Sequence, residues 1–315
     1  MIAKPIEILQ MFPVRKTKDQ KQAFRDAVQV YAEGLGYPVA VEKGSFGSQN
    51  VIIGDPKTAS FLVTAHYDTC VGLPVPNLIT PCNPLLYIGY QLFVTIVMCF
   101  IPALVYGAAW YFVRDSYTAF LCAYVTFLLE LVYMRLGAAN PSNANDNTSG
   151  VVTVLEIARS IPENRRDRVC FVLFDLEESG LKGSKSYRKA HKEETDRQII
   201  LNMDCVGDGD QIMFFPTSKL KKDRRKLNPM FTCCGQFGGK NISIRDKGFS
   251  VYPSDQNSFP YGTAICALHK GKLGLYFSRI HTPKDTVLEE TNVNLLRAAL
   301  TTYITCTESE RKECL

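Results

Sequence analysis

The chain has 315 residues, of which 46% are hydrophobic, and a formal net charge of +5. This length holds one large domain or two small ones, and the hydrophobic content is ordinary for a folded protein. The charge is modest and scattered, with one basic cluster at residues 219–226. This cluster fits a solvated surface, or contact with anionic lipid or an acidic partner. Beyond it, no feature of the sequence supports nucleic-acid binding.

The cysteines predict a reducing compartment. There are 11 of them, an odd number, and no CxxC pair that would indicate a structural zinc site. The amino-terminal residues lack a long apolar core and a small-residue cleavage site, so we expect no secretory signal. We therefore interpret the cysteines as small buried hydrophobic residues.

The first predicted elements lead to a histidine. Residues 17–35 have apolar side chains at near-helical spacing among charged ones, and Gly36 follows, which predicts an amphipathic covering helix. Residues 61–65 then form a predicted strand that ends at His66, and Asp68 lies two positions further on. A histidine in this position is commonly a hydrogen-bonded structural residue, but an acid nearby can orient a metal-binding histidine.

An uncharged region follows. Residues 69–113 contain no Asp, Glu, Lys, Arg or His. Within this region, residues 85–113 exceed the roughly 20 residues that cross a bilayer core. Residues 116–136 form a second candidate span that includes Glu130, and Arg114 and Asp115 lie between the two. We predict an inserted helical hairpin with both ends on the same side of a membrane.

The hairpin leaves alternatives open. Aromatic residues near the ends of the first segment are typical of membrane interfaces, whereas an apolar lid or a dimer surface would have a similar composition. Eight Lys and Arg residues precede the first span, against Arg114 alone at the tip. We therefore expect a two-pass membrane protein whose domain outside the hairpin lies on the cytoplasmic face.

Acidic residues recur in the second half. Asp146 lies in the turn-rich segment 143–150, just before a predicted helix over residues 151–160 that Asn147 or Thr148 would cap, and it could itself be a simple capping acid. A predicted strand over residues 171–174 is followed by Glu177 and Glu178, which could instead face water.

The last predicted elements continue this pattern. A strand over residues 198–203 ends at Asp204, and His281 follows a short apolar run over residues 274–277. Residues 212–215 are a candidate edge strand, and residues 292–306 form the closing helix.

These strand-end residues suggest a metal centre. Five of these residues offer nitrogen or oxygen donors of the kind that zinc accepts. Five ligands are too many for one zinc ion with an open position, but they suit two ions that share a bridging carboxylate. Adjacent carboxylates repel each other unless one binds a cation and the other holds a proton, so Glu177 is the candidate general base. The five predicted ligands are His66, Asp146, Glu178, Asp204 and His281.

Five motifs, in this order along the chain, resemble the co-catalytic zinc aminopeptidases that include bacterial leucyl aminopeptidases and glutamate carboxypeptidases. The motifs are AHYDT (65–69), NDNTSG (145–150), FDLEESGLKGS (174–184), NMDCVG (202–207) and HTPKDT (281–286).

The resemblance implies a single α/β domain with a mixed central sheet flanked by helices. It also implies that two zinc ions share Asp146. One would be held with His66 and Asp204, and the other with Glu178 and His281. Glu177 would then be the general base and Asp68 the partner of His66.

Two departures from the family pattern stand out. Gln256 replaces a histidine of many relatives, and the hairpin fills a gap between His66 and Asp146 that relatives cross with a short loop. The predicted organisation is a peptidase domain in two parts, residues 1–84 and 137–315, around the hairpin at 85–136.

We predict a zinc-dependent exopeptidase that acts on the amino ends of peptides. The alternatives are acyl transfer like that of glutaminyl cyclases on the same scaffold, or a non-catalytic membrane scaffold. The sequence leaves the oligomeric state open.

Overall fold

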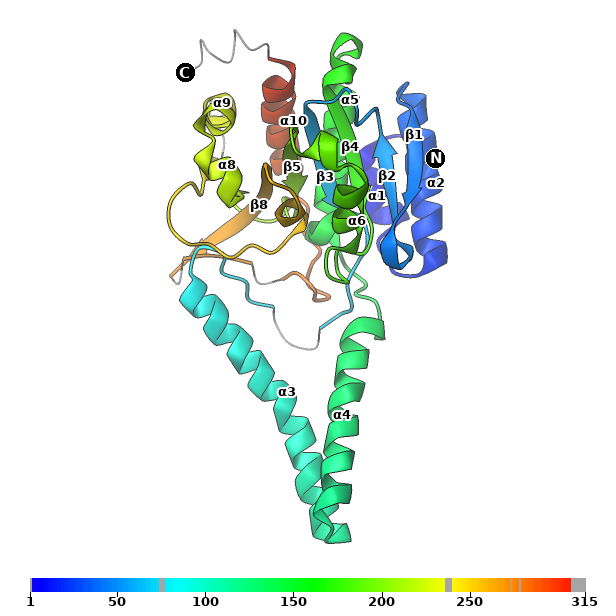
Figure 1. Ribbon diagram of the computed structural model, residues 1–315, viewed down its shortest axis with the longest axis vertical. Helices are drawn as coiled ribbons and strands as arrows, with labels where there is room; N and C mark the ends of the chain where they lie inside the picture. The colour runs from blue at the N-terminus through cyan, green and yellow to red at the C-terminus, as the bar shows by residue number, and fades with distance from the viewer. Residues whose placement is uncertain (1, 74–76, 236–239, 273, 278, 307–315) are drawn as a thin grey trace.

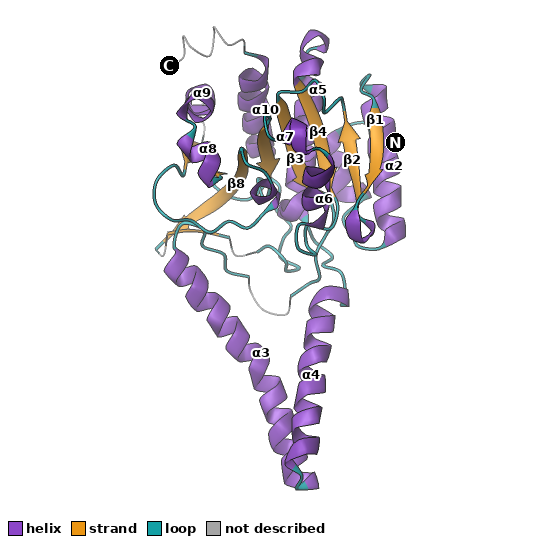
Figure 2. Cartoon of the chain, viewed as in Figure 1, coloured by secondary structure: helices purple, strands orange, loops and turns teal. Residues whose placement is uncertain are grey.

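A computed structural model describes residues 2–73, 77–235, 240–272, 274–277 and 279–306. Its centre is a mixed sheet with the strand order β1-β2-β4-β3-β5-β8-β6-β7, and β9 pairs with β8 (Figures 1 and 2). The strands are β1 Val39–Lys43, β2 Gln49–Ile53, β3 Phe61–His66, β4 Val169–Phe174, β5 Ile199–Met203, β6 Gln211–Pro216, β7 Asn241–Ile244, β8 Gly262–Gly271 and β9 Gly274–Tyr276. The α-helices are α1 Ile8–Met11, α2 Lys18–Gly34, α3 Pro84–Val113, α4 Ser116–Leu136, α5 Gly150–Ser160, α6 Lys182–Ala190, α7 Lys192–Thr195, α8 Ser218–Lys222, α9 Arg224–Gly235 and α10 Glu290–Thr305.

The middle of the sheet is parallel. β4, β3, β5 and β8 run in the same direction, and β2 and β6 pair antiparallel to β4 and β8. Every residue of β3, β4 and β5 is buried, because helices cover both faces of the sheet. Strands buried on both faces have continuous apolar runs, which is the pattern in the sequence of β4.

Alternate residues of a strand reach different cores. Phe61 and Val63 of β3 pack with α2, α5 and α10 in the main hydrophobic core, whereas Leu62 packs with Tyr187 of α6 in a smaller one. This alternation is the two-residue period of a strand. It fixes the register of β3 and therefore the position of His66 at its end.

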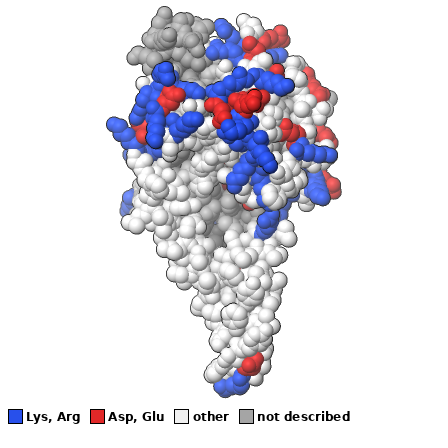
Figure 3. Space-filling model, viewed as in Figure 1, with Lys and Arg blue, Asp and Glu red and all other residues white. Residues whose placement is uncertain are grey.

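The helices α3 and α4 project away from the domain as a hairpin (Figure 1). Both are long and apolar enough to cross a membrane by length and composition, and only 6% of the most apolar window of each is buried. Side chains such as Ile96 and Phe100 are more than half exposed. Figure 3 shows an uncharged extension with charged residues at its tip. A lid folded onto the domain is therefore the wrong interpretation of this segment.

The predicted elements match the observed ones closely, with one correction. The strands expected over 61–65, 171–174 and 198–203 are β3, β4 and β5, and the helices expected over 17–35 and 151–160 are α2 and α5. The strand expected at the edge, residues 212–215, is β6, which pairs with β8 on one side and β7 on the other. The short β7 is mostly exposed and lacks the apolar run that would reveal it in the sequence.

Candidate metal centre

The predicted site residues meet at the carboxyl edge of the parallel strands. His66 is the last residue of β3, Asp204 follows β5, and Glu177 and Glu178 follow β4. Because these three strands are parallel neighbours, the segments after them lie side by side, where open α/β sheets form their ligand site. The loop that carries Asp146 lies at the same edge, where its Oδ1 contacts His66.

Asp146 lies between the two histidines. Its Oδ1 is 3.2 Å from His66 Nε2, and its Oδ2 is 2.9 Å from His281 Nε2. His66 Nε2 is also 3.8 Å from Asp204 Oδ1, and His281 Nε2 is 3.5 Å from Glu178 Oε1. The site thus has two halves, His66 with Asp204 and His281 with Glu178, which meet at the two oxygens of one carboxylate.

A buried acid that the sequence reasoning missed holds this loop in place. Asp285 accepts hydrogen bonds from the backbone N–H groups of Asn145 (2.8 Å) and Asp146 (2.9 Å). Asn147 accepts one from the N–H of Gly150 and donates one to the carbonyl of Met203, so it ties the start of α5 to the end of β5, although Ser149, not the predicted Asn147 or Thr148, is the N-cap of α5. Asp285 lies in the HTPKDT motif, so the motif was the feature of the sequence from which its role could have been predicted.

Asp68 contacts His66 in a different way from the prediction. The backbone carbonyl of Asp68 is 3.1 Å from His66 Nδ1, whereas its Oδ1 is 3.7 Å away. The two carboxylate oxygens accept hydrogen bonds from the backbone N–H groups of Glu177 (3.0 Å) and Glu178 (3.2 Å). Asp68 therefore fixes both the histidine ring and the segment that carries the two glutamates.

Arg15 is a fully buried cation beside the site that no sequence pattern indicated. It donates to the carbonyl of Tyr67 and to Thr148 Oγ1, and so connects the end of β3 with the Asp146 loop. Burial lowers the pKa of Arg15 to about 10, while the nearby Asp68 and Asp146 act to raise it. The guanidinium stays charged near neutral pH and partly offsets these carboxylates.

The site is strongly acidic. Burial raises the pKa of Glu177 well above its usual value and that of Glu178 to about 7. Burial opposes charge on His281, but Glu178 and Asp146 outweigh it and raise its pKa to about 10. In the metal-free protein the raised pKa values favour the protonated forms of these groups, and a metal ion that binds them must displace the protons they hold.

The donors fit zinc. Imidazole nitrogens and carboxylate oxygens are its usual ligands besides thiolate. The donor atoms of His66, Asp146 and Asp204 lie within 4.8 Å of one another, as do those of His66, Glu177 and Glu178. Among the described residues, buried Glu178 Oε1 has no hydrogen-bond partner, which is costly unless a cation takes that place. Excess negative charge and an unsatisfied oxygen both favour a bound divalent ion.

The pattern of exposure indicates where a ligand enters. The side chains of His66, Asp146 and Asp204 are almost fully buried, whereas His281 is 26% exposed. The site therefore opens on the side of His281 and Glu178.

Comparison with protein families agrees with this geometry. The model of peptidase family M28 matches residues 132–304, more than half of the chain. The chain belongs to peptidase family M28. It therefore has the scaffold of a zinc-dependent metallopeptidase, as the strand-end donors predicted. A comparison with curated protein sequences found no match.

Solved structures share this M28 fold. The LapA aminopeptidase of Legionella pneumophila aligns with a TM-score of 0.60 and 15% identity over 96% of this chain and 68% of its own. A Zn-dependent exopeptidase from Parabacteroides distasonis gives 0.59 and 15% over 96% of each chain. A glutaminyl cyclase from Bacteroides thetaiotaomicron gives 0.61 and 13% over 96% of each chain. At identities this low, the likeness to these structures shows a shared fold and nothing more.

Gln256 lies beside the site, buried, in a pocket of about 580 Å³. Its Nε2 donates to the carbonyl of Tyr252, whose hydroxyl donates to the backbone carbonyl of Asp204. The glutamine is thus part of a hydrogen-bonded wall between the pocket and Asp204.

Proposed function

We propose that this M28 member is a membrane-attached aminopeptidase that uses two zinc ions. The observation that carries the proposal is the position of Asp146, whose two oxygens face different histidines at 3.2 and 2.9 Å. A carboxylate in this position can bridge two metal ions, and each ion would also be bound by one histidine and one further acid. His66 and Asp204 would hold one ion, and His281 and Glu178 the other.

Glu177 is the proposed general base. Zinc supplies Lewis acidity, which polarises the scissile carbonyl and lowers the pKa of water. Glu177 then takes a proton from the attacking water and returns it to the leaving amine. Burial already raises the pKa of Glu177 well above its usual value, which suits a group that must hold a proton between these two steps. Asp68 holds its backbone N–H at 3.0 Å and fixes its direction.

The charge of the site favours the amino end of a peptide. Five carboxylates converge there, Asp68, Asp146, Glu177, Glu178 and Asp204, and two divalent ions together with the buried Arg15 guanidinium balance their charge, so no cation is left over. A free α-amino group is a cation that can pair with one of these carboxylates, whereas a terminal carboxylate has no spare cation to pair with. This argument favours aminopeptidase over carboxypeptidase action.

The membrane would lie next to this site. The backbone N–H of Gly72, before α3, donates to the carbonyl of Ala138, after α4, and Asn140 donates to Cys70 in the same way. The N–H of Leu73 donates to the carbonyl of His281 itself. The connections to the hairpin are therefore joined to each other and to the site, so a hairpin inserted in a bilayer holds the opening near the lipid surface.

The proposal places the domain on the cytoplasmic side. Arg135 lies in the last turn of α4, at the end of the hairpin nearest the domain, and the Lys16 ammonium donates to its carbonyl. Arg114 is the only cation at the opposite tip. The base thus has two cations, Arg135 and Lys16, against one at the tip, and the side with the excess of Lys and Arg is usually cytoplasmic.

The test uses the full chain in detergent, stripped with a chelator and then titrated with zinc. Hydrolysis of a panel of aminoacyl amides, with carboxyl-terminal reporters and a peptide with amino-terminal glutamine as comparisons, is measured alongside bound metal. We expect amide hydrolysis to return as the second zinc binds. Cyclisation of the glutaminyl peptide without hydrolysis would favour the cyclase alternative, and two bound ions without any turnover would contradict the proposal.

A further inference from the structure

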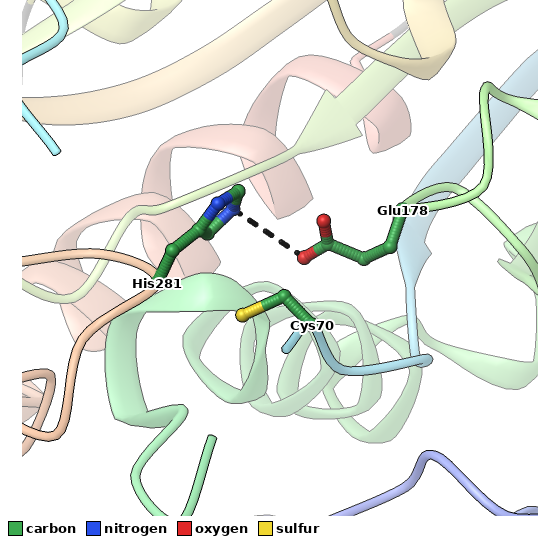
Figure 4. Close-up of side chains that lie close together, drawn as sticks. All are labelled: Cys70, Glu178 and His281. Atoms are coloured by element: carbon green, nitrogen blue, oxygen red, sulfur yellow. Dashed lines mark ion pairs between the residues drawn. The ribbon is translucent and has the colours of Figure 1, made fainter. Parts of the chain in front are cut away.

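A cysteine lies at the open half of the metal centre. Cys70 is in the connection between β3 and α3, two residues after Asp68, and its side chain is 6% exposed. The donor atoms of Cys70, Glu178 and His281 all lie within 4.8 Å of one another. Figure 4 shows its sulfur beside the ion pair of Glu178 and His281.

Hydrophobic packing does not account for this thiol. Other buried cysteines, such as Cys170 and Cys266, belong to hydrophobic clusters, but Cys70 belongs to none of the clusters formed by the described residues. The hydrogen bond recorded for its sulfur is a long one, 3.8 Å to Asn143 Oδ1. A thiol that faces a carboxylate and an imidazole, with little else to bind, is in an environment suited to a metal ligand.

A second observation points to the same place. Glu178 Oε1 is buried and has no hydrogen-bond partner among the described residues, although it lies 3.5 Å from His281 Nε2. An ion between the thiol and these two groups would satisfy this oxygen. The cluster therefore combines three different kinds of donor around one point.

We propose that Cys70 is a ligand of the second metal ion, together with His281, Glu178 and the shared Asp146. The inference rests on the proposed two-zinc centre and adds a sulfur donor to it. On binding, the thiol S–H bond breaks, the proton passes to solvent, and the sulfur electron pair forms the bond to zinc. The thiolate, not the thiol, is the ligand.

The distances allow this coordination. Bonds of about 2.0 Å to nitrogen or oxygen and about 2.3 Å to sulfur place the donors of a tetrahedral zinc site roughly 3.3 to 3.6 Å apart. The 3.5 Å between His281 and Glu178 already fits. From the 4.8 Å limit the sulfur must move by at most about 1.3 Å, which a rotation of roughly 45° about the Cys70 Cα–Cβ bond achieves.

A sulfur ligand changes which ion this half of the site prefers. Thiolates favour zinc, whereas magnesium and manganese prefer oxygen donors. In the half with His66, Asp146 and Asp204, the Cys205 thiol donates to Asp204 Oδ1 (3.2 Å), but it is not within 4.8 Å of all three donor atoms as Cys70 is of its two partners. We therefore expect the two positions to differ in metal selectivity, with the Cys70 position the more selective for zinc.

The first test loads the full detergent-purified chain with cobalt(II), whose bonds to thiolate give a charge-transfer band in the near ultraviolet. We expect this band in the wild-type protein, its loss in Cys70→Ser and Cys70→Ala, and its retention in Cys170→Ala, a control for another buried cysteine. Bound cobalt is counted in each sample. Two bound ions without the band, or a band that persists in Cys70→Ala, would overturn the inference and leave the two-metal proposal intact.

The second test needs no variant and so does not depend on whether a substitution folds. Alkylation of Cys70 by iodoacetamide is followed by mass spectrometry in the metal-free and zinc-loaded protein. We expect zinc to slow modification of Cys70 at least tenfold. Equal rates with both ions bound would contradict ligation by the thiol, and failure to bind metal at all would contradict both this inference and the proposed function.

Discussion

The strand β4 and the helix α3 are both uncharged apolar segments, but they lie in opposite environments. Every residue of β4 is buried beneath helices, whereas α3 exposes most of its large side chains, including Ile96 and Phe100. The two segments differ in length. The six residues of β4 fit inside the domain, whereas the thirty residues of α3 extend beyond it. Apolar composition alone therefore does not decide between a core and a membrane surface.

The two regions also treat charge differently. At the end of β4 the chain buries several carboxylates whose charge only cations can compensate, an arrangement typical of a functional site. The hairpin keeps its charges near its tip and its base, with Glu130 as the exception within α4. We propose chemistry for the sheet edge and membrane attachment for the hairpin, and substitutions can test each proposal separately.

The largest expected effect is at the sheet edge. Glu177→Gln keeps the shape of the side chain but removes the base, so we expect turnover to fall about 10²- to 10⁴-fold. Zinc content and membrane association should stay unchanged, because the proposed ligands and the hairpin are intact. Steady-state hydrolysis with metal counting measures this, and Glu193→Gln on the exposed side of α7 is the control. Loss of zinc together with activity would show that Glu177 is a ligand instead.

A matched pair of phenylalanines compares the two apolar regions directly. Phe171 in β4 is fully buried and Phe100 in α3 is 61% exposed. We expect Phe171→Ala to cost about 3 to 5 kcal/mol, through lost burial and the cavity that remains. Phe100→Ala leaves no cavity in the domain and should change its stability by less than about 0.5 kcal/mol.

Thermal unfolding of the domain in detergent measures both variants. The loss expected for Phe171→Ala corresponds to a decrease of roughly 6 to 20 °C in Tm. Equal decreases in Tm for the two variants would mean that α3 packs into the domain in solution. That result would contradict the proposed difference between β4 and α3.

A smaller effect concerns attachment. Ile96→Lys places a charge in the middle of α3, which costs about 2.5 to 3.5 kcal/mol if this helix lies in lipid. We expect less protein in the membrane fraction after carbonate extraction. Phe46→Lys, at an exposed phenylalanine of the domain, is the control and should have no effect. Unchanged extraction of the Ile96 variant, or a soluble wild-type protein, would contradict the membrane assignment.

Several site residues could be predicted because their signals are local. His66, Asp204 and the Glu177–Glu178 pair each follow an apolar strand within a few residues, and strands that recur in this way predict one ligand edge. Asp285, Arg15 and Cys70 could not be assigned roles in this way. Each acts through a partner distant in sequence, such as the N–H of Asp146 for Asp285 or Thr148 for Arg15. No spacing rule connects such pairs.

The sequence by itself determined the sheet strands near the site, the hairpin and the donor types, because periodicity, length and side-chain chemistry are properties of neighbouring residues. The tertiary structure alone decided that Asp146 faces both histidines, that Asp68 holds the glutamates through their backbone, and that Cys70 joins the open half of the site. These relations depend on how parallel strands bring distant loops to one edge. They arise only when the whole chain has packed.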